Sequence, residues 1–136
     1  MNELVFDMSR AWSRHVITVY DYDALIDTGA DITVCTLPKA AIQKKFNILG
    51  QTDRTVDSAS GEMAGTIYIV EEFIVGDLVM QGVPIFSPNN KTTLKTKFTL
   101  GKDLFDGLIY EFNTIDYKFT IKIPDDKLIR KYSKLT

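Results

Sequence analysis

Length, composition and charge bound this protein before any motif is considered. The 136 residues fit one domain that can bury a sizeable core, and 45% hydrophobic with 25% charged residues is ordinary for a soluble globular protein. A net charge of −2 offers no basic face to phosphates, which argues against a nucleic-acid-binding module. We therefore expect a single domain over residues 1–136.

Cysteine, histidine and apolar runs exclude further classes. Cys35 is the only cysteine, so no disulfide forms within the chain, and its apolar-alternating surroundings favour a buried strand residue over a nucleophile. His15 is the only histidine, so the usual zinc ligands are missing, and we expect no metal and no cofactor. No stretch resembles a signal peptide or reaches the roughly 20 apolar residues that cross a bilayer. We expect no membrane partner and a cytoplasmic location, or a domain excised from a longer precursor.

The first part of the chain predicts short strands followed by one short helix. β-Branched and aromatic residues indicate strands over 16–20, 24–26 and 32–37. Pro38 suits the first turn of a helix that continues to Phe46. The strand over 24–26 leads directly into Asp-Thr-Gly-Ala at residues 27–30, and Asp-Thr-Gly occurs only once in the chain.

The middle of the chain predicts two hairpins. The first has arms over 55–57 and 66–70, and its tip over 58–65 is rich in small residues, so we expect the tip to be exposed and mobile. The second turns at Gly76-Asp77, between strands over 72–75 and 78–80. A further strand over 83–86 contains Pro84, which favours an edge or the start of a strand.

The last part predicts three strands and one helical turn. The strands are expected over 98–101, 108–110 and 117–123, with the helical turn over 102–105. Apolar and polar residues alternate along the last strand, and the tail over 127–136 stays open between helix and strand. Many short strands separated by turns predict an all-β fold, a closed β-barrel with one or two short helices.

A lone carboxylate on a tight turn after a buried strand is half of an acid–base pair. Hydrolysis of an amide at mild pH needs a base that activates water and an acid that protonates the leaving amine. Two carboxylates a hydrogen bond apart cannot both ionise, so they share one proton and supply both functions. Because the chain has one such turn, the second Asp27 must come from a second copy, and a C2 homodimer brings the two together.

The residues around Asp27 resemble the active-site loop of retropepsin-like aspartic proteases, a family for which the shared proton of two aspartates is well established. The sequence Leu-Ile-Asp-Thr-Gly-Ala-Asp at 25–31, a short helix, a glycine-bearing hairpin and Thr-Leu-Gly-Lys-Asp at 99–103 occur in the family's order. The resemblance covers about residues 16–123. It implies an acid-protease fold with one lobe per chain, a homodimer and a polypeptide substrate, with the chain ends as candidates for the dimer interface.

The resemblance also assigns roles to particular residues. The catalytic set is Asp27, with one copy per subunit, Thr28 and Gly29. The substrate-binding set, which includes a flap over the bound peptide, is Ala30, Asp31, Ser60, Gly61, Glu62 and Met63. The structural-support set is Leu100, Gly101, Lys102 and Asp103, with lysine where family members often carry arginine.

The expected function is that of an aspartic endopeptidase that cuts extended peptides with apolar side chains around the scissile bond. One alternative keeps the same fold as a non-catalytic peptide-binding or dimerisation module. Another takes Asp-Thr-Gly as an ordinary β-turn in an unrelated barrel. The lysine clusters, over 91–102 and 118–134, are interpreted as solvated strand edges and loops.

Overall fold

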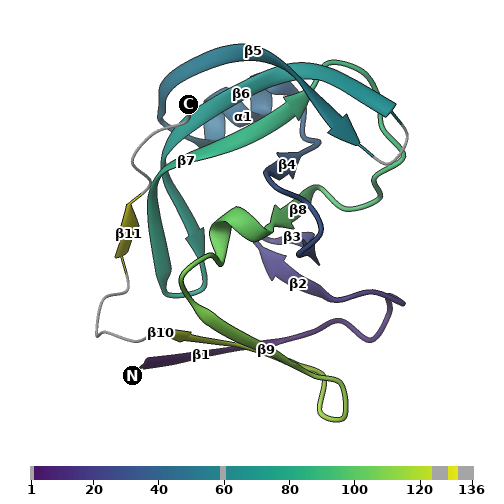
Figure 1. Cartoon of the computed structure of the whole chain (residues 1–136), viewed down its shortest axis with the longest axis vertical. Helices are drawn as coiled ribbons and strands as arrows, with labels where there is room; N and C mark the ends of the chain where they lie inside the picture. The colour runs from purple at the N-terminus through teal and green to yellow at the C-terminus, as the bar shows by residue number, and fades with distance from the viewer. Residues whose placement is uncertain (1, 59–60, 124–128, 132–136) are drawn as a thin grey trace.

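A computed structural model describes residues 2–58, 61–123 and 129–131 of the chain (Figure 1). Most of these residues lie in strands, as predicted for an all-β protein. In chain order the elements are β1 (Asn2–Asp7), β2 (Val16–Val19), β3 (Tyr22–Asp27), β4 (Thr33–Cys35), α1 (Lys39–Lys45), β5 (Ile48–Ser58), β6 (Gly61–Val75), β7 (Leu78–Pro88), β8 (Phe98–Gly101), the 3-10 turn η1 (Lys102–Leu104), β9 (Ile109–Asn113), β10 (Lys118–Ile123) and β11 (Ile129–Lys131).

The strands form two sheets, and the predicted closed barrel is wrong. The larger sheet has the order β2-β3-β8-β4-β7-β6-β5, with β11 beside β7, and the smaller sheet has the order β1-β10-β9. Within the described ranges, the end strands β2 and β5 do not pair with each other, so the larger sheet stays open. Most of β5 is exposed to solvent, and the hairpin that it forms with β6 extends away from β2 (Figure 1).

An aromatic cluster fixes the turn between β2 and β3 to the rest of the core. The Tyr20 ring packs 5.3 Å from the Phe46 ring and 5.5 Å from the Phe73 ring, measured between centroids. Its hydroxyl accepts a hydrogen bond of 2.8 Å from the backbone N–H of Ile74 in β6. Tyr20 and Asp21 have positive φ angles of 51° and 65°, as a tight turn between two strands requires.

Several predicted elements are confirmed. The helix α1 begins directly after Pro38 and buries Ile42, and the helical turn η1 follows β8. Cys35 is fully buried in β4, and burial raises the pKa of its thiol to about 11. In β10 the buried residues alternate with partly exposed ones, as the sequence pattern indicated.

The two predicted hairpins share one long central strand, because residues 66–70 and 72–75 both belong to β6. The strands predicted over 78–80 and 83–86 likewise form the single strand β7, which lies inside the sheet. Pro84 lies opposite Ile69 of β6, and it falls between the part of β7 that pairs with β11 and the part that pairs with β4. The prediction of an edge was therefore wrong for the strand, although Pro84 sits where neither β11 nor β4 pairs with β7.

The smaller sheet uses the N-terminal segment. β1 pairs along its length with β10 of the same chain, from Asn2 opposite Ile123 to Asp7 opposite Lys118. In the part of the chain that the structure describes, the outer edge of β1 pairs with no other strand. Across the described residues, no helix combines the length and apolar character needed to span a membrane.

Candidate active site

Asp27 lies at the end of β3, where the buried strand enters a tight turn. Ala24, Leu25 and Ile26 are buried, whereas Asp27 is half-buried. The backbone N–H of Gly29 donates a hydrogen bond of 3.1 Å to Oδ1 of Asp27. The backbone N–H of Ala30 donates a hydrogen bond of 3.0 Å to the carbonyl oxygen of Asp27. The turn therefore presents one carboxyl group at the surface with its position set by the backbone.

The neighbouring strand β8 holds the turn in place. β3 and β8 are parallel, and Asp27 lies opposite Gly101. The backbone N–H of Lys102 donates a hydrogen bond of 2.8 Å to the carbonyl oxygen of Ala30. A Cβ atom at Gly101 would lie 2.7 Å from the backbone carbonyl carbon and oxygen of Ile32, so only glycine allows this close approach.

A buried threonine connects the same two segments. The backbone N–H of Gly101 donates to Oγ1 of Thr33 over 3.1 Å, and the Thr33 hydroxyl donates to Oδ1 of Asp103 over 3.2 Å. Burial raises the pKa of Asp103 to about 6, against the opposing effect of the hydrogen bond from Thr33. Sequence reasoning placed Asp103 in the structural-support set but missed Thr33. The available signal was a hydroxyl side chain in an otherwise apolar run, directly after the Asp27 turn.

Lys102 and Asp31 meet on the outer side of the turn. Nζ of Lys102 lies 3.5 Å from Oδ1 of Asp31, and both side chains are exposed. An exposed pair of this kind contributes about 0–1 kcal/mol to stability. The ion pair joins a residue expected to bind substrate to one expected to support the loop.

The residues expected to form the flap lie on the hairpin of β5 and β6. Asp57 lies opposite Glu62 and Ser58 opposite Gly61, whose φ of +113° suits glycine. Gly61 and Glu62 are exposed, and Met63 is partly buried. Ser60 lies outside the described residues. The tip is shorter than predicted, because β6 already begins at Gly61.

A small apolar cluster joins this hairpin to the strand that follows the Asp27 turn. Its buried members are Val34, Ile67 and Phe86. The partly buried side chains packed against them are Ile32, Val56, Met63, Ile69 and Leu94. These residues come from the start of β4, both arms of the hairpin, β7 and the loop before β8. We call them the hairpin cluster. It places the hairpin and that loop against the segment that leaves the Asp27 turn.

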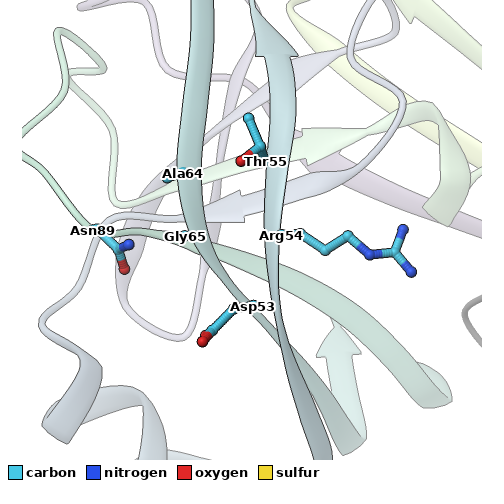
Figure 2. A pocket seen from close by; sticks show the side chains of 6 residues that line it. All are labelled: Asp53, Arg54, Thr55, Ala64, Gly65 and Asn89. Carbon is cyan, nitrogen blue, oxygen red and sulfur yellow. The ribbon is translucent and has the colours of Figure 1, made fainter.

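A recess of about 380 Å³ lies on the outer part of the hairpin (Figure 2). Asp53 and Asn89 line it, and the Arg54 side chain points away from them (Figure 2). Oδ1 of Asp53 accepts a hydrogen bond of 3.1 Å from the Thr66 hydroxyl. None of the described residues of the expected catalytic and substrate-binding sets lines this recess. Over the residues that the structure describes, no group of three or more His, Cys, Asp and Glu side chains is placed to hold a metal ion.

Comparison with known proteins identifies the family of the chain. The family model described as aspartyl protease matches residues 18–109, which include the Asp27 turn, the hairpin and β8. A crystal structure of a retropepsin-like aspartic protease from Rickettsia conorii is similar, with a TM-score of 0.56 and 16% sequence identity. The similarity covers 88% of this chain and 89% of that chain. No curated protein matches the sequence significantly. The chain therefore belongs to the aspartyl protease family of peptidases, and it has the fold of a retropepsin-like member.

Proposed function

We propose that the protein is an aspartic endopeptidase that acts as a homodimer, with one Asp27 from each subunit. The observation that carries the proposal is the single Asp27 carboxyl, half-buried on a turn that β8 and Thr33 hold in place. Within the described ranges, no hydrogen bond or ion pair joins this carboxyl to a second acidic side chain of the same chain. A second subunit supplies the missing carboxyl by symmetry.

In the proposed reaction, the two Asp27 carboxyls share one proton. The ionised carboxyl accepts a proton from a water molecule, whose oxygen forms a bond to the carbonyl carbon of the scissile amide. The protonated carboxyl acts as the acid, and the leaving nitrogen gains the proton with which it departs as an amine. Thr28 joins the two turns across the dimer axis, and Gly29 allows the substrate backbone to approach closely.

The proposed substrate is an extended polypeptide with apolar side chains around the scissile bond. The hairpin cluster supports this, because its partly buried apolar side chains lie next to the segment that follows the Asp27 turn. Ala30 and Asp31 contact the peptide from the turn, and Ser60, Gly61, Glu62 and Met63 cover it from the hairpin. Backbone groups at a hairpin end pair well with an extended peptide.

The first test compares Asp27→Asn with Asp23→Asn. Asp23 is an exposed aspartate of the same strand, so the control makes the same substitution four residues away from Asp27. We expect Asp27→Asn to lower kcat by at least a factor of about 10²–10⁴, because the base and the acid are both lost. Asp23→Asn keeps wild-type turnover. Turnover by a correctly folded Asp27→Asn protein overturns the proposal, as does peptide binding without cleavage by the wild type.

The second test concerns the dimer. Excess Asp27→Asn protein is added to a fixed amount of wild type, so that most wild-type chains enter mixed dimers. We expect the wild-type activity to fall toward zero, because a mixed dimer has only one ionisable Asp27. Activity that does not change with added variant, together with a monomeric mass by light scattering at the assay concentration, rejects the homodimer.

A further inference from the structure

The segment from Leu78 to Lys102 has charge of one sign only. It contains four lysines and no aspartate or glutamate, although the whole chain has a net charge of −2. Lys102 pairs with Asp31, whereas Lys91, Lys95 and Lys97 are exposed and make no ion pair with any described residue. These three lysines lie in the loop over 89–97, which connects β7 to β8.

This loop borders a recess of about 220 Å³ that no carboxylate of a described residue lines. Lys91 and Lys97 line it together with Asn90, Thr92, Leu94 and Thr36. The lining therefore combines two lysines with an asparagine amide and with the Thr92 hydroxyl, which accepts a backbone hydrogen bond and keeps its own proton to donate. A volume of this size accommodates one acidic side chain.

Backbone contacts fix the walls of the recess. The backbone N–H of Thr36 donates to the carbonyl oxygen of Lys97 over 2.9 Å, and the Thr36 hydroxyl donates to the carbonyl oxygen of Thr96 over 3.2 Å. On the other wall, the Thr92 hydroxyl oxygen accepts a hydrogen bond of 3.2 Å from the backbone N–H of Leu94. The two ammonium groups thus extend from a loop whose backbone is tied to β4 and to itself.

The recess borders the proposed peptide site. Leu94 lines the recess and also belongs to the hairpin cluster, whose other members come from both hairpin arms, β7 and the segment after the Asp27 turn. In Figure 1 the loop between β7 and β8 passes beside the end of β5 and the start of β6. A peptide that lies along the hairpin cluster therefore reaches the recess with side chains beyond those at the scissile bond.

We propose that Lys91 and Lys97 bind an acidic side chain of the polypeptide substrate, away from the scissile bond, and so select substrates with an Asp or Glu in that segment. This inference rests on the proposed peptidase function. A peptide carboxylate suits the recess better than a nucleic acid, because none of the described residues that line it is an aromatic residue for base stacking and the rest of the chain is acidic.

The first experiment uses pairs of peptides that differ only by Glu or Gln at one position, moved stepwise away from the scissile bond. The enzymes are wild type, Lys91→Gln/Lys97→Gln and the control Lys44→Gln, which removes an exposed lysine from α1. We expect wild type and control to prefer Glu at one or two positions by about two- to fivefold in kcat/KM, as exposed ion pairs allow. The double variant loses the preference, and added salt weakens it.

A binding measurement separates this inference from the proposed function. The same peptides, labelled with a fluorophore, are titrated with Asp27→Asn protein, and anisotropy reports binding without cleavage. The Glu peptide should bind more tightly than the Gln peptide, and Lys91→Gln/Lys97→Gln should abolish the difference. Lys91→Glu/Lys97→Glu should instead prefer a Lys peptide.

Each outcome has a definite meaning. Equal binding and equal kcat/KM for Glu and Gln peptides at every position overturn the acidic-substrate site and leave the peptidase intact. A binding preference without any wild-type cleavage overturns the proposed function alone. Displacement of the Glu peptide by a single-stranded oligonucleotide of equal charge, at lower concentration than the unlabelled peptide, overturns the proposal in favour of a phosphate site.

Discussion

The strands β3, β8 and β4 differ sharply from the hairpin of β5 and β6, although both border the proposed peptide site. Every residue of β8 and β4 is buried, whereas most of β5 and the start of β6 are exposed. The Asp27 carboxyl lies at the end of β3, one of these buried strands. The charged side chain expected to cover the peptide, Glu62, lies on the hairpin. Changes in the buried strands should therefore alter stability and activity together, while changes at the exposed positions of the hairpin should alter charge with little effect on the fold.

The largest effect is expected at Gly101. In Gly101→Ala the new Cβ meets the backbone of Ile32 at 2.7 Å, and backbone cannot move aside as a flexible side chain does. We expect a loss of about 1–3 kcal/mol in the free energy of unfolding, measured with urea, and a loss of activity because Asp27 lies opposite this residue.

Gly50→Ala is the matched control for this change. A Cβ at Gly50 meets nothing within 4 Å. Gly50 lies near the start of β5, in the hairpin with which the buried strands are compared. Its effect should stay within about 0.5 kcal/mol. Equal destabilisation by the two variants would contradict the contrast between buried strands and hairpin.

The second effect is expected at Thr33. Thr33→Val keeps the shape of the side chain but leaves the Gly101 N–H without its hydroxyl acceptor in a buried site. Such a loss costs about 1–3 kcal/mol, measured by thermal or urea unfolding. Thr33→Ser keeps the hydroxyl but loses the methyl group. Comparison of the two variants therefore separates the effect of the hydrogen bond from the effect of the methyl group. Thr18→Val, at an exposed position of β2, should change little.

The third prediction concerns pH. Burial is the main cause that raises the pKa of Asp103 from 3.8 to about 6. Between these two pH values the folded protein therefore keeps a proton on Asp103 that the unfolded chain has released. The contribution to stability is therefore present below pH 3.8 and is lost as pH rises toward 6. Asp103→Asn should flatten this part of the stability–pH curve and be more stable than wild type above it. A parallel curve for the variant would show that another group causes the dependence.

The smallest effect is expected on the hairpin. Asp57 and Glu62 are like charges on directly opposite residues of β5 and β6, both exposed. Asp57→Lys creates an opposite-charge pair and should stabilise the hairpin by about 0.2–1 kcal/mol at low salt. Hydrogen exchange of the amides near the hairpin end measures this. Asp57→Lys/Glu62→Lys restores like charges and should remove the gain.

The sequence predicted local features well and long-range pairing poorly. β-Branched runs, Pro38 and the alternation after Lys118 located strands and the helix, because these signals depend on neighbouring residues. The closed barrel was wrong because closure depends on whether β2 and β5 meet, and no local pattern encodes that. The division of β6 and β7 into shorter strands was also wrong, since turn-forming residues inside a long strand resemble loop residues.

The same limit applies to the candidate site. Asp27, Gly101 and Lys102 were singled out from short motifs, and the structure brings the segments that contain them side by side. Thr33 and its hydrogen bond to Asp103 were missed, because the two residues are 70 positions apart and no local sequence pattern indicates such a contact. The recess beside Leu94 was also missed, since its lysines alone look like solvated charge.

Burial of Cys35 makes the only thiol of the molecule a natural reporter of strand separation. Cys35 lies opposite Phe98 of β8 and is fully buried, so a reagent reaches its sulfur only when the core around β4 opens. The rate of labelling under native conditions therefore measures how often the strands beside the Asp27 turn open. Substrates or inhibitors that close the site should slow this labelling, even where they never touch the cysteine.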